Sequence, residues 1–185
     1  SEVERLVEEV RKSNKKWEEE SRELTERNKK LNRETTKRAE DLLERVRELV
    51  RTVTEIIKRE GTDEKVEELV RRVKKALREL IETLKDLVRR DDEKSRKLIE
   101  DDRKILKEDE ERVEELIKDL DRKRRDERLK RIVEEIRDSV RRLKEKSEEL
   151  VRRNEESNDR LRRRVEEIAK EARDLVRRLE EEVRR

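Results

Sequence analysis

Carboxylates are the only abundant side chains in this sequence that could do acid–base chemistry, because its 185 residues include 55 Asp and Glu but no His and no Cys. A catalytic triad or a thiolate nucleophile needs His or Cys, and a phosphate-binding loop needs more than the one glycine present. Glu pairs such as Glu4 and Glu8, or Glu111 and Glu115, have the spacing of a salt-bridged helix surface. The sequence therefore predicts that the protein is not an enzyme and has no catalytic residues, no cofactor-binding residues and no cofactor.

Short polar side chains recur along a stripe that would otherwise be apolar. In one stretch they are Ser13, Asn14, Ser21, Thr25, Asn28, Asn32, Thr35 and Thr36. Trp17, Leu24 and Leu31 lie between them, which gives apolar and polar layers about 3.5 residues apart, the spacing of one face of a helix. The alternation predicts a helix that turns both kinds of layer toward a core.

The composition favours an all-α fold. Charged residues make up 61% of the chain, Pro, Met, Phe and Tyr are absent, and strands would need aromatic and turn residues. Hydrophobic residues make up 28%, close to the two-in-seven density of a coiled-coil seam. We expect long, nearly straight helices at about residues 1–60, 63–120 and 126–185.

Two boundaries separate these helices. Gly61 stands where a helix end needs a residue that tolerates positive φ, and Thr62 and Asp63 follow it as oxygen caps. Leu120 and Leu129 are nine residues apart, which would place them on opposite faces of a continuous helix. We therefore predict a loop at 121–126, with Asp126 in the capping role of Asp63; Ser1 is the predicted cap of the first helix.

Short connections make sequential helices antiparallel, so the fold class predicted is an up-down-up antiparallel three-helix bundle forming one domain over 1–185. The stripe of the third helix repeats that of the first at a constant offset. The antiparallel register that best aligns the second helix gives four polar layers: Asp109 with Asn14 and Ser139; Asp102 with Ser21 and Ser147; Ser95 with Asn28 and Asn154; Asp91 with Asn32 and Asn158. Ser13 and Ser157 complete the predicted buried polar network.

The polar layers have two interpretations. In the first, they specify helix register, since a buried polar group left without a partner costs about 1 to 3 kcal/mol and penalises mispaired arrangements. In the second, the layers with Asp91, Asp102 and Asp109 weaken one half of the bundle, so that it opens for a partner helix or responds to pH through buried carboxylates. Each layer supplies one carboxylate, so no metal site is predicted.

The charge pattern argues against several partners. Lys and Arg number 58 and Asp and Glu 55, for a net charge of +3, and the two signs alternate along the chain, whereas a nucleic-acid-binding protein would segregate its basic residues. The basic run at 122–125 is flanked by acids and is interpreted as a solvated turn. No apolar run approaches the roughly 18 residues of a membrane span, and no signal-peptide pattern occurs. We expect no nucleic acid, membrane or small-molecule partner.

Apolar residues beside the predicted stripes leave the oligomeric state open. The first stripe runs through Leu42, Val46, Leu49 and Val53, and residues such as Leu43 widen it. In a monomer the wider stripe would contact two neighbouring helices, and in an oligomer part of it would form a second interface. We expect a monomer, with a homo-oligomer or an added partner helix as the alternatives.

The chain resembles de novo designed helical bundles, coiled-coil proteins with modular buried hydrogen-bond networks. The features that carry the resemblance are Leu, Val and Ile in the seams, Glu, Lys, Arg and Asp outside, Ser, Asn, Thr and Asp in discrete layers, and helices of equal length. The resemblance implies a structural scaffold without a natural biochemical function, a soluble synthetic protein expressed in a bacterial cytoplasm. Natural charged single helices lack such a continuous apolar seam.

Overall fold

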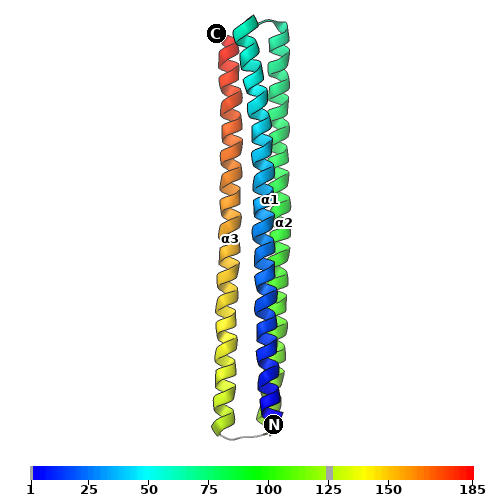
Figure 1. Ribbon diagram of the computed structural model, residues 1–185, viewed down its shortest axis with the longest axis vertical. Coiled ribbons are helices and arrows are strands. Elements are labelled where there is room, and N and C mark those ends of the chain that lie inside the picture. The colour runs from blue at the N-terminus through cyan, green and yellow to red at the C-terminus, as the bar shows by residue number, and fades with distance from the viewer. Residues whose placement is uncertain (1, 124–126) are drawn as a thin grey trace. The chain divides into compact units, whose positions relative to one another are not determined.

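The computed structural model describes residues 2–123 and 127–185 (Figure 1). They form three α-helices, α1 (Glu2–Glu60), α2 (Glu64–Lys123) and α3 (Glu127–Arg184), and these described residues include no strand. The helices pack against one another, which confirms the all-α three-helix bundle. Helix α2 continues past its predicted end at residue 120, because the next residues include no Gly or Pro to stop it. Ser1 and Asp126, the two other predicted caps, lie outside the described residues.

The turn between α1 and α2 has the predicted chemistry. Gly61 has a φ of 73°, a left-handed conformation that costs a side chain about 1 to 2 kcal/mol and glycine almost nothing. Its N–H donates to the carbonyl oxygen of Ile57 at 2.9 Å, which satisfies one of the last carbonyls of α1. Gly61 therefore ends α1.

Asp63 starts α2. Its Oδ1 accepts a hydrogen bond from the backbone N–H of Val66 at 3.0 Å, and its carbonyl accepts from the N–H of Glu67 at 3.1 Å. Glu64 and Glu67 add negative charge to the first turn, where the helix dipole favours it. The predicted cap is confirmed.

We expect Asp63→Ala to lower the free energy of unfolding by about 1 kcal/mol, because the substitution removes this N-cap hydrogen bond. Thr62→Ala is the matched control, since Thr62 is exposed one residue earlier in the same turn. The shift of the urea unfolding midpoint, followed by circular dichroism at 222 nm, measures both. Equal shifts in the two variants would contradict the assignment of Asp63 as the cap.

The chain divides into two compact units, each holding one segment of every helix. Unit 1 comprises Ser1–Lys29 and Lys94–Glu156, and unit 2 comprises Lys30–Glu93 and Ser157–Arg185. Within unit 2, Arg162 pairs with Asp92 at 2.6 Å and Lys74 with Glu180 at 3.3 Å, so residue numbers fall along α2 as they rise along α3 and the two helices are antiparallel. A single domain over 1–185 stays a prediction.

The apolar core of unit 2 is one continuous cluster. Its buried members are Ala39, Leu43, Val46, Val50, Val53, Val66, Val70, Val73, Leu80, Leu84, Leu161, Val165, Ile168, Ala172, Val176 and Leu179. Leu69, Leu77 and Val88 of α2 are partly buried against it. Three helix segments thus share one hydrophobic core.

The predicted stripe of α1 is displaced by one residue at two positions in this core. Leu49 was placed on the inward face but is 45% exposed, while its neighbour Val50 is buried. Adjacent helical residues point about 100° apart, so only one of two neighbouring apolar residues can face the core centre. Leu43 is likewise more deeply buried than Leu42, and the inward stripe therefore runs through Leu43 and Val50.

Unit 1 has a smaller apolar cluster. Its buried members are Leu6, Val10, Val113, Leu116, Ile117, Leu120, Leu129, Val133 and Ile136. The buried positions nearer the middle of the helices in this unit are mostly polar. The apolar residues interspersed with them are Trp17, Leu24, Leu143 and Val151. Apolar burial is therefore concentrated at the end of unit 1 that includes the start of α1.

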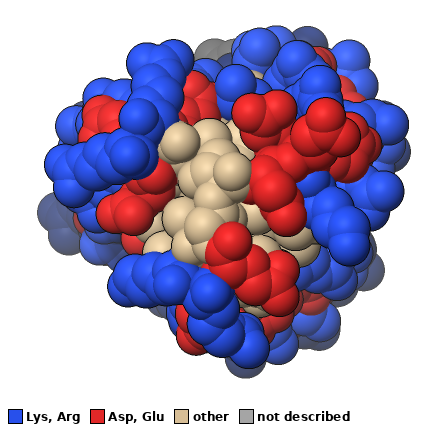
Figure 2. Space-filling model, turned by 90° about the horizontal axis from the view of Figure 1, so that it is seen from above, with Lys and Arg blue, Asp and Glu red and all other residues tan. Residues whose placement is uncertain are grey.

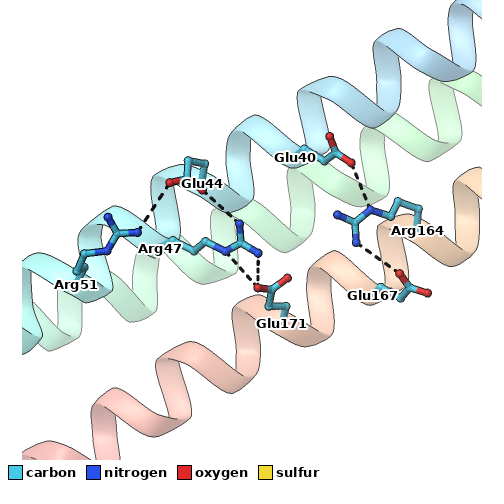
Figure 3. A network of polar contacts seen from close by, with 7 residues as sticks. All are labelled: Glu40, Glu44, Arg47, Arg51, Arg164, Glu167 and Glu171. Carbon is cyan, nitrogen blue, oxygen red and sulfur yellow. Dashed lines mark hydrogen bonds and ion pairs between the residues drawn. The ribbon is translucent and has the colours of Figure 1, made fainter.

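Charged side chains cover the outside of the helices. Figure 2, seen from the end where α1 and α2 join, shows Lys and Arg interleaved with Asp and Glu around uncharged residues. Figure 3 shows the Arg47 guanidinium of α1 reaching the Glu171 carboxylate of α3, and Arg164 of α3 contacting Glu40 of α1 at 3.3 Å. Exposed pairs of this kind contribute about 0.2 to 1 kcal/mol each. Within the described residues, no helix has a stretch apolar enough to cross a membrane.

Candidate functional site: the buried polar side chains

Most residues of the predicted polar network have little solvent exposure. Those classed as buried are Ser21, Asn28, Asn32, Asp91, Ser95, Asp102, Asp109, Ser147, Asn154 and Asn158. Ser13, Asn14, Ser139 and Ser157 are half-buried. Buried polar groups need hydrogen-bond partners, so their contacts decide whether each layer stabilises the fold.

Unit 2 contains a connected polar layer. The Asn32 side-chain nitrogen of α1 lies 2.9 Å from Asn158 Oδ1 and 2.8 Å from Ser157 Oγ of α3. On the other side, Thr35 Oγ1 of α1 donates to Asp91 Oδ2 of α2 at 3.0 Å. These five side chains, which we call the unit 2 polar layer, connect all three helices.

The Asn32 amide can also satisfy Asp91 directly. With the amide turned by half a rotation, its nitrogen lies 2.8 Å from Asp91 Oδ1 and 2.9 Å from Oδ2, and its oxygen accepts from Ser157 Oγ at 2.8 Å. An ionised carboxylate only accepts hydrogen bonds, so it favours the orientation that presents the amide nitrogen. In that orientation the Asn32 oxygen also lies 2.9 Å from the side-chain amide of Asn158 and accepts from it when that amide turns as well, so Asn32 contacts α2 and α3 at once.

The layer predicted from Ser21, Asp102 and Ser147 is only half paired. Ser147 Oγ donates to Asp102 Oδ2 at 3.3 Å. Ser21 Oγ and Asp102 Oδ1 are buried without a hydrogen-bond partner among the described residues, so the predicted layer lacks a hydrogen bond between Asp102 and Ser21. A serine hydroxyl extends one bond beyond Cβ, and a small offset between two helices removes such a contact.

The layer predicted from Asn14, Asp109 and Ser139 pairs differently from the prediction. The Asn14 side-chain nitrogen donates to Ser139 Oγ at 3.2 Å, and Asp109 Oδ1 accepts from the Ser13 hydroxyl instead of from Asn14. Ser13 and Asn14 point about 100° apart on α1, so one faces α2 while the other faces α3. The expected contact of Asp109 with Asn14 is therefore wrong.

Burial raises the pKa of Asp109, because desolvation disfavours the charged carboxylate. The hydrogen bond from Ser13 and the positive charge of Arg112 act in the opposite direction, and Glu110 adds to the increase. Asp109 thus lies in unit 1 as a buried carboxyl that holds its proton more tightly than an exposed one.

The layer predicted from Asn28, Ser95 and Asn154 is buried throughout. Asn28 and Ser95 have no exposed surface, and Asn154 is nearly as buried. All three lie in unit 1. The pairing of Ser95 with both Asn residues stays a prediction.

Two buried threonines were not included in the predicted network. Thr35 donates to Asp91, and Thr25 donates to the carbonyl oxygen of Ser21 at 3.0 Å within α1. Both belong to the polar stretch seen in the sequence, so their spacing could have identified them. Thr25 bonds to its own backbone, which is the common arrangement for threonine in a helix and does not connect helices.

Among the residues that the structure describes, no group of three or more Asp or Glu side chains could hold a metal ion. The surface of unit 1 has a groove of about 110 Å³ beside Trp17 and Asp109. The polar side chains thus form interior contacts between helices.

No protein-family model and no curated protein matches the chain. Among solved structures, the chain is similar to one described as "Computationally designed three helix bundle", with 22% identity over 99% of this chain and 84% of that chain and a TM-score of 0.42.

Proposed function

We propose that the chain is a designed structural scaffold, without enzymatic activity, whose buried polar side chains specify how its helices align. The sequence consists mostly of charged residues with a continuous apolar seam, which supports the scaffold role. The seam provides a hydrophobic core and the charged residues provide a soluble surface. On this proposal the protein is a monomer that needs no cofactor, nucleic acid, membrane or small molecule.

The observation that carries this proposal is the unit 2 polar layer. Asn32 contacts Asn158 and Ser157, and Thr35 contacts Asp91, so the side chains of three helices meet at one level. A shift of one helix would leave these groups buried without partners, at about 1 to 3 kcal/mol for each. An apolar layer of the same size would tolerate the shift, since hydrophobic contacts are not directional.

A second candidate is an interaction module that associates with another copy or takes up a partner helix. The observation that favours it is unit 1, where buried polar atoms such as Ser21 Oγ and Asp102 Oδ1 lack partners among the described residues. A helix carrying suitable donors would gain hydrogen bonds there.

The experiment compares the parent with an apolar-layer variant, in which Asn32, Asp91 and Asn158 become Leu and Thr35 becomes Val. Size-exclusion chromatography with light scattering over a concentration series measures the mass of each. We expect the parent to give one species of 22.9 kDa at all concentrations. We expect the variant to give a mixture with larger species, because it lacks the penalty on mispaired helices.

An apolar-layer variant that remains a single 22.9 kDa species would contradict the role of the layer in specifying the association state. A parent mass that rises with concentration would favour the oligomerising interaction module instead. The two results are independent, because the first concerns the variant and the second the parent.

A further inference from the structure

The two units differ in how well their buried polar atoms are satisfied. In unit 2, each of the buried polar side chains Asn32, Thr35, Asp91 and Asn158 takes part in a hydrogen bond between helices. In unit 1, buried atoms without a partner among the described residues include Asn14 Oδ1, Trp17 Nε1, Ser21 Oγ, Asp102 Oδ1, Asp109 Oδ2 and Asn154 Oδ1. The free-energy cost of buried polar atoms without hydrogen-bond partners therefore falls on unit 1.

Apolar burial does not offset this penalty. Unit 2 has the larger hydrophobic cluster, while that of unit 1 is confined to one end. Low apolar burial and unsatisfied polar groups both lower the free energy needed to open a segment. Unit 1 is thus the easier of the two to open.

The unpartnered atoms of unit 1 are mostly hydrogen-bond acceptors. The amide oxygens of Asn14 and Asn154 and one carboxylate oxygen each of Asp102 and Asp109 only accept, whereas Trp17 Nε1 donates. In the interior of unit 1, unpartnered acceptors therefore outnumber unpartnered donors. Adding a proton to a carboxylate turns one acceptor into a donor and removes a buried charge.

Asp109 is a buried carboxyl of unit 1 whose hydrogen-bond donor and charged neighbours can be named from all three helices. Ser13 of α1 donates to its Oδ1, and a groove beside it is lined by Lys16 and Glu20 of α1 and by Glu108 and Arg112 of α2. From α3, Lys144 pairs with Glu110, the neighbour of Asp109, at 3.5 Å. These nearby charges are mixed in sign, so the burial of Asp109 decides the direction in which its pKa shifts.

We propose that unit 1 opens locally while unit 2 stays folded, and that proton uptake by Asp109 closes unit 1 again. This goes beyond the scaffold role, which concerns how the folded helices are aligned. Because burial raises the pKa of Asp109, the folded form binds the proton at a pH where the opened form has released it. This stabilisation of the closed form of unit 1 is complete below pH 3.8, the ordinary pKa of an Asp side chain. It is lost as the pH rises through the raised pKa of Asp109.

Trp17 makes the opening of unit 1 directly measurable. It is the only tryptophan in the chain and is 1% exposed, so its fluorescence reports on unit 1 alone. Circular dichroism at 222 nm reports on helix in both units. In urea at pH 7, we expect the Trp17 transition to have a lower midpoint than the dichroism transition. Coincident midpoints would overturn the proposal of local opening.

Hydrogen–deuterium exchange followed by mass spectrometry tests the same opening without denaturant. After correction for intrinsic rates, we expect backbone amides of residues 13–28 to exchange at least about tenfold faster than those of residues 39–53. Equal protection of the two segments of α1 would also overturn the proposal.

The role of Asp109 is tested by Asp109→Asn, which keeps the shape of the side chain and removes its charge. At pH 7 we expect amides of residues 13–28 to exchange roughly threefold or more slowly in the variant than in the parent, and the difference to shrink toward pH 4.5. The control is Asp138→Asn, an exposed carboxylate of the same unit paired with Arg141. It should alter exchange equally at both pH values.

Two results would overturn the role of Asp109. One is a pH-independent difference between Asp109→Asn and the parent. The other, measured on the parent alone, is exchange of residues 13–28 that does not slow relative to residues 39–53 between pH 7 and pH 4.5. Neither result bears on the register role of the unit 2 polar layer, which is tested in unit 2 and at constant pH.

Discussion

Replacing Leu43 with Ala is expected to lower the free energy of unfolding by about 2 to 5 kcal/mol, because the substitution removes buried methyl groups and leaves a cavity. Leu43 is 1% exposed and belongs to the apolar cluster of unit 2. Urea unfolding followed by circular dichroism at 222 nm measures the loss.

Leu49→Ala is the matched control, since Leu49 lies on the same helix segment and is 45% exposed. Most of its surface is already in water, so we expect a loss below about 1 kcal/mol. A Leu49 variant that loses as much as the Leu43 variant would mean that the inward stripe of α1 runs through Leu42 and Leu49.

The second large effect is expected from Asn32→Leu, with a loss of about 2 to 4 kcal/mol. The substitution removes the amide that contacts Asn158 and Ser157 and that can donate to Asp91. The partners stay buried, and an unsatisfied or unpaired buried group costs more than the original bond contributed. Urea unfolding midpoints measure the loss.

The apolar-layer variant distinguishes this mechanism from a simple loss of packing. Replacing all four buried members together removes the unsatisfied partners, so we expect its free energy of unfolding to equal or exceed that of the parent. If Asn32→Leu alone were as stable as the parent, the unit 2 polar layer would not constrain the helices.

Much of the fold could be predicted from the sequence because its signals are local. Gly61 identifies the end of α1 by its unique backbone freedom, and Asp63 identifies the start of α2 by its capping oxygen. The even spacing of apolar residues was enough to place three helices. The burial of Asn32, Asp91 and Asn158 also agrees with the sequence pattern.

The pairing within the layers could not be predicted, because it depends on lateral geometry between helices. Neighbours such as Ser13 and Asn14 are both polar, and spacing alone does not say which of them faces Asp109. The adjacent apolar residues Leu49 and Val50 present the same ambiguity, which only the packing of three helices decides. The concentration of unsatisfied polar atoms in unit 1 likewise depends on rotamers and offsets that a periodic pattern does not contain.

The most direct test of register specification is cross-linking between α1 and α3. Glu40 and Arg164 form an ion pair at 3.3 Å, so Glu40→Cys with Arg164→Cys reports the native register. Arg47→Cys with Arg164→Cys reports a shift of one heptad, about 10 Å along the helix. The chain has no cysteine of its own, so a short bis-maleimide reacts only at the introduced pair.

The measurement is the yield of each cross-link in the parent background and in the apolar-layer variant. If the polar layer specifies register, the parent background gives the native link alone, and the apolar-layer variant gives both links. The native link alone in both backgrounds would contradict this account, because the register would then be set without the unit 2 polar layer.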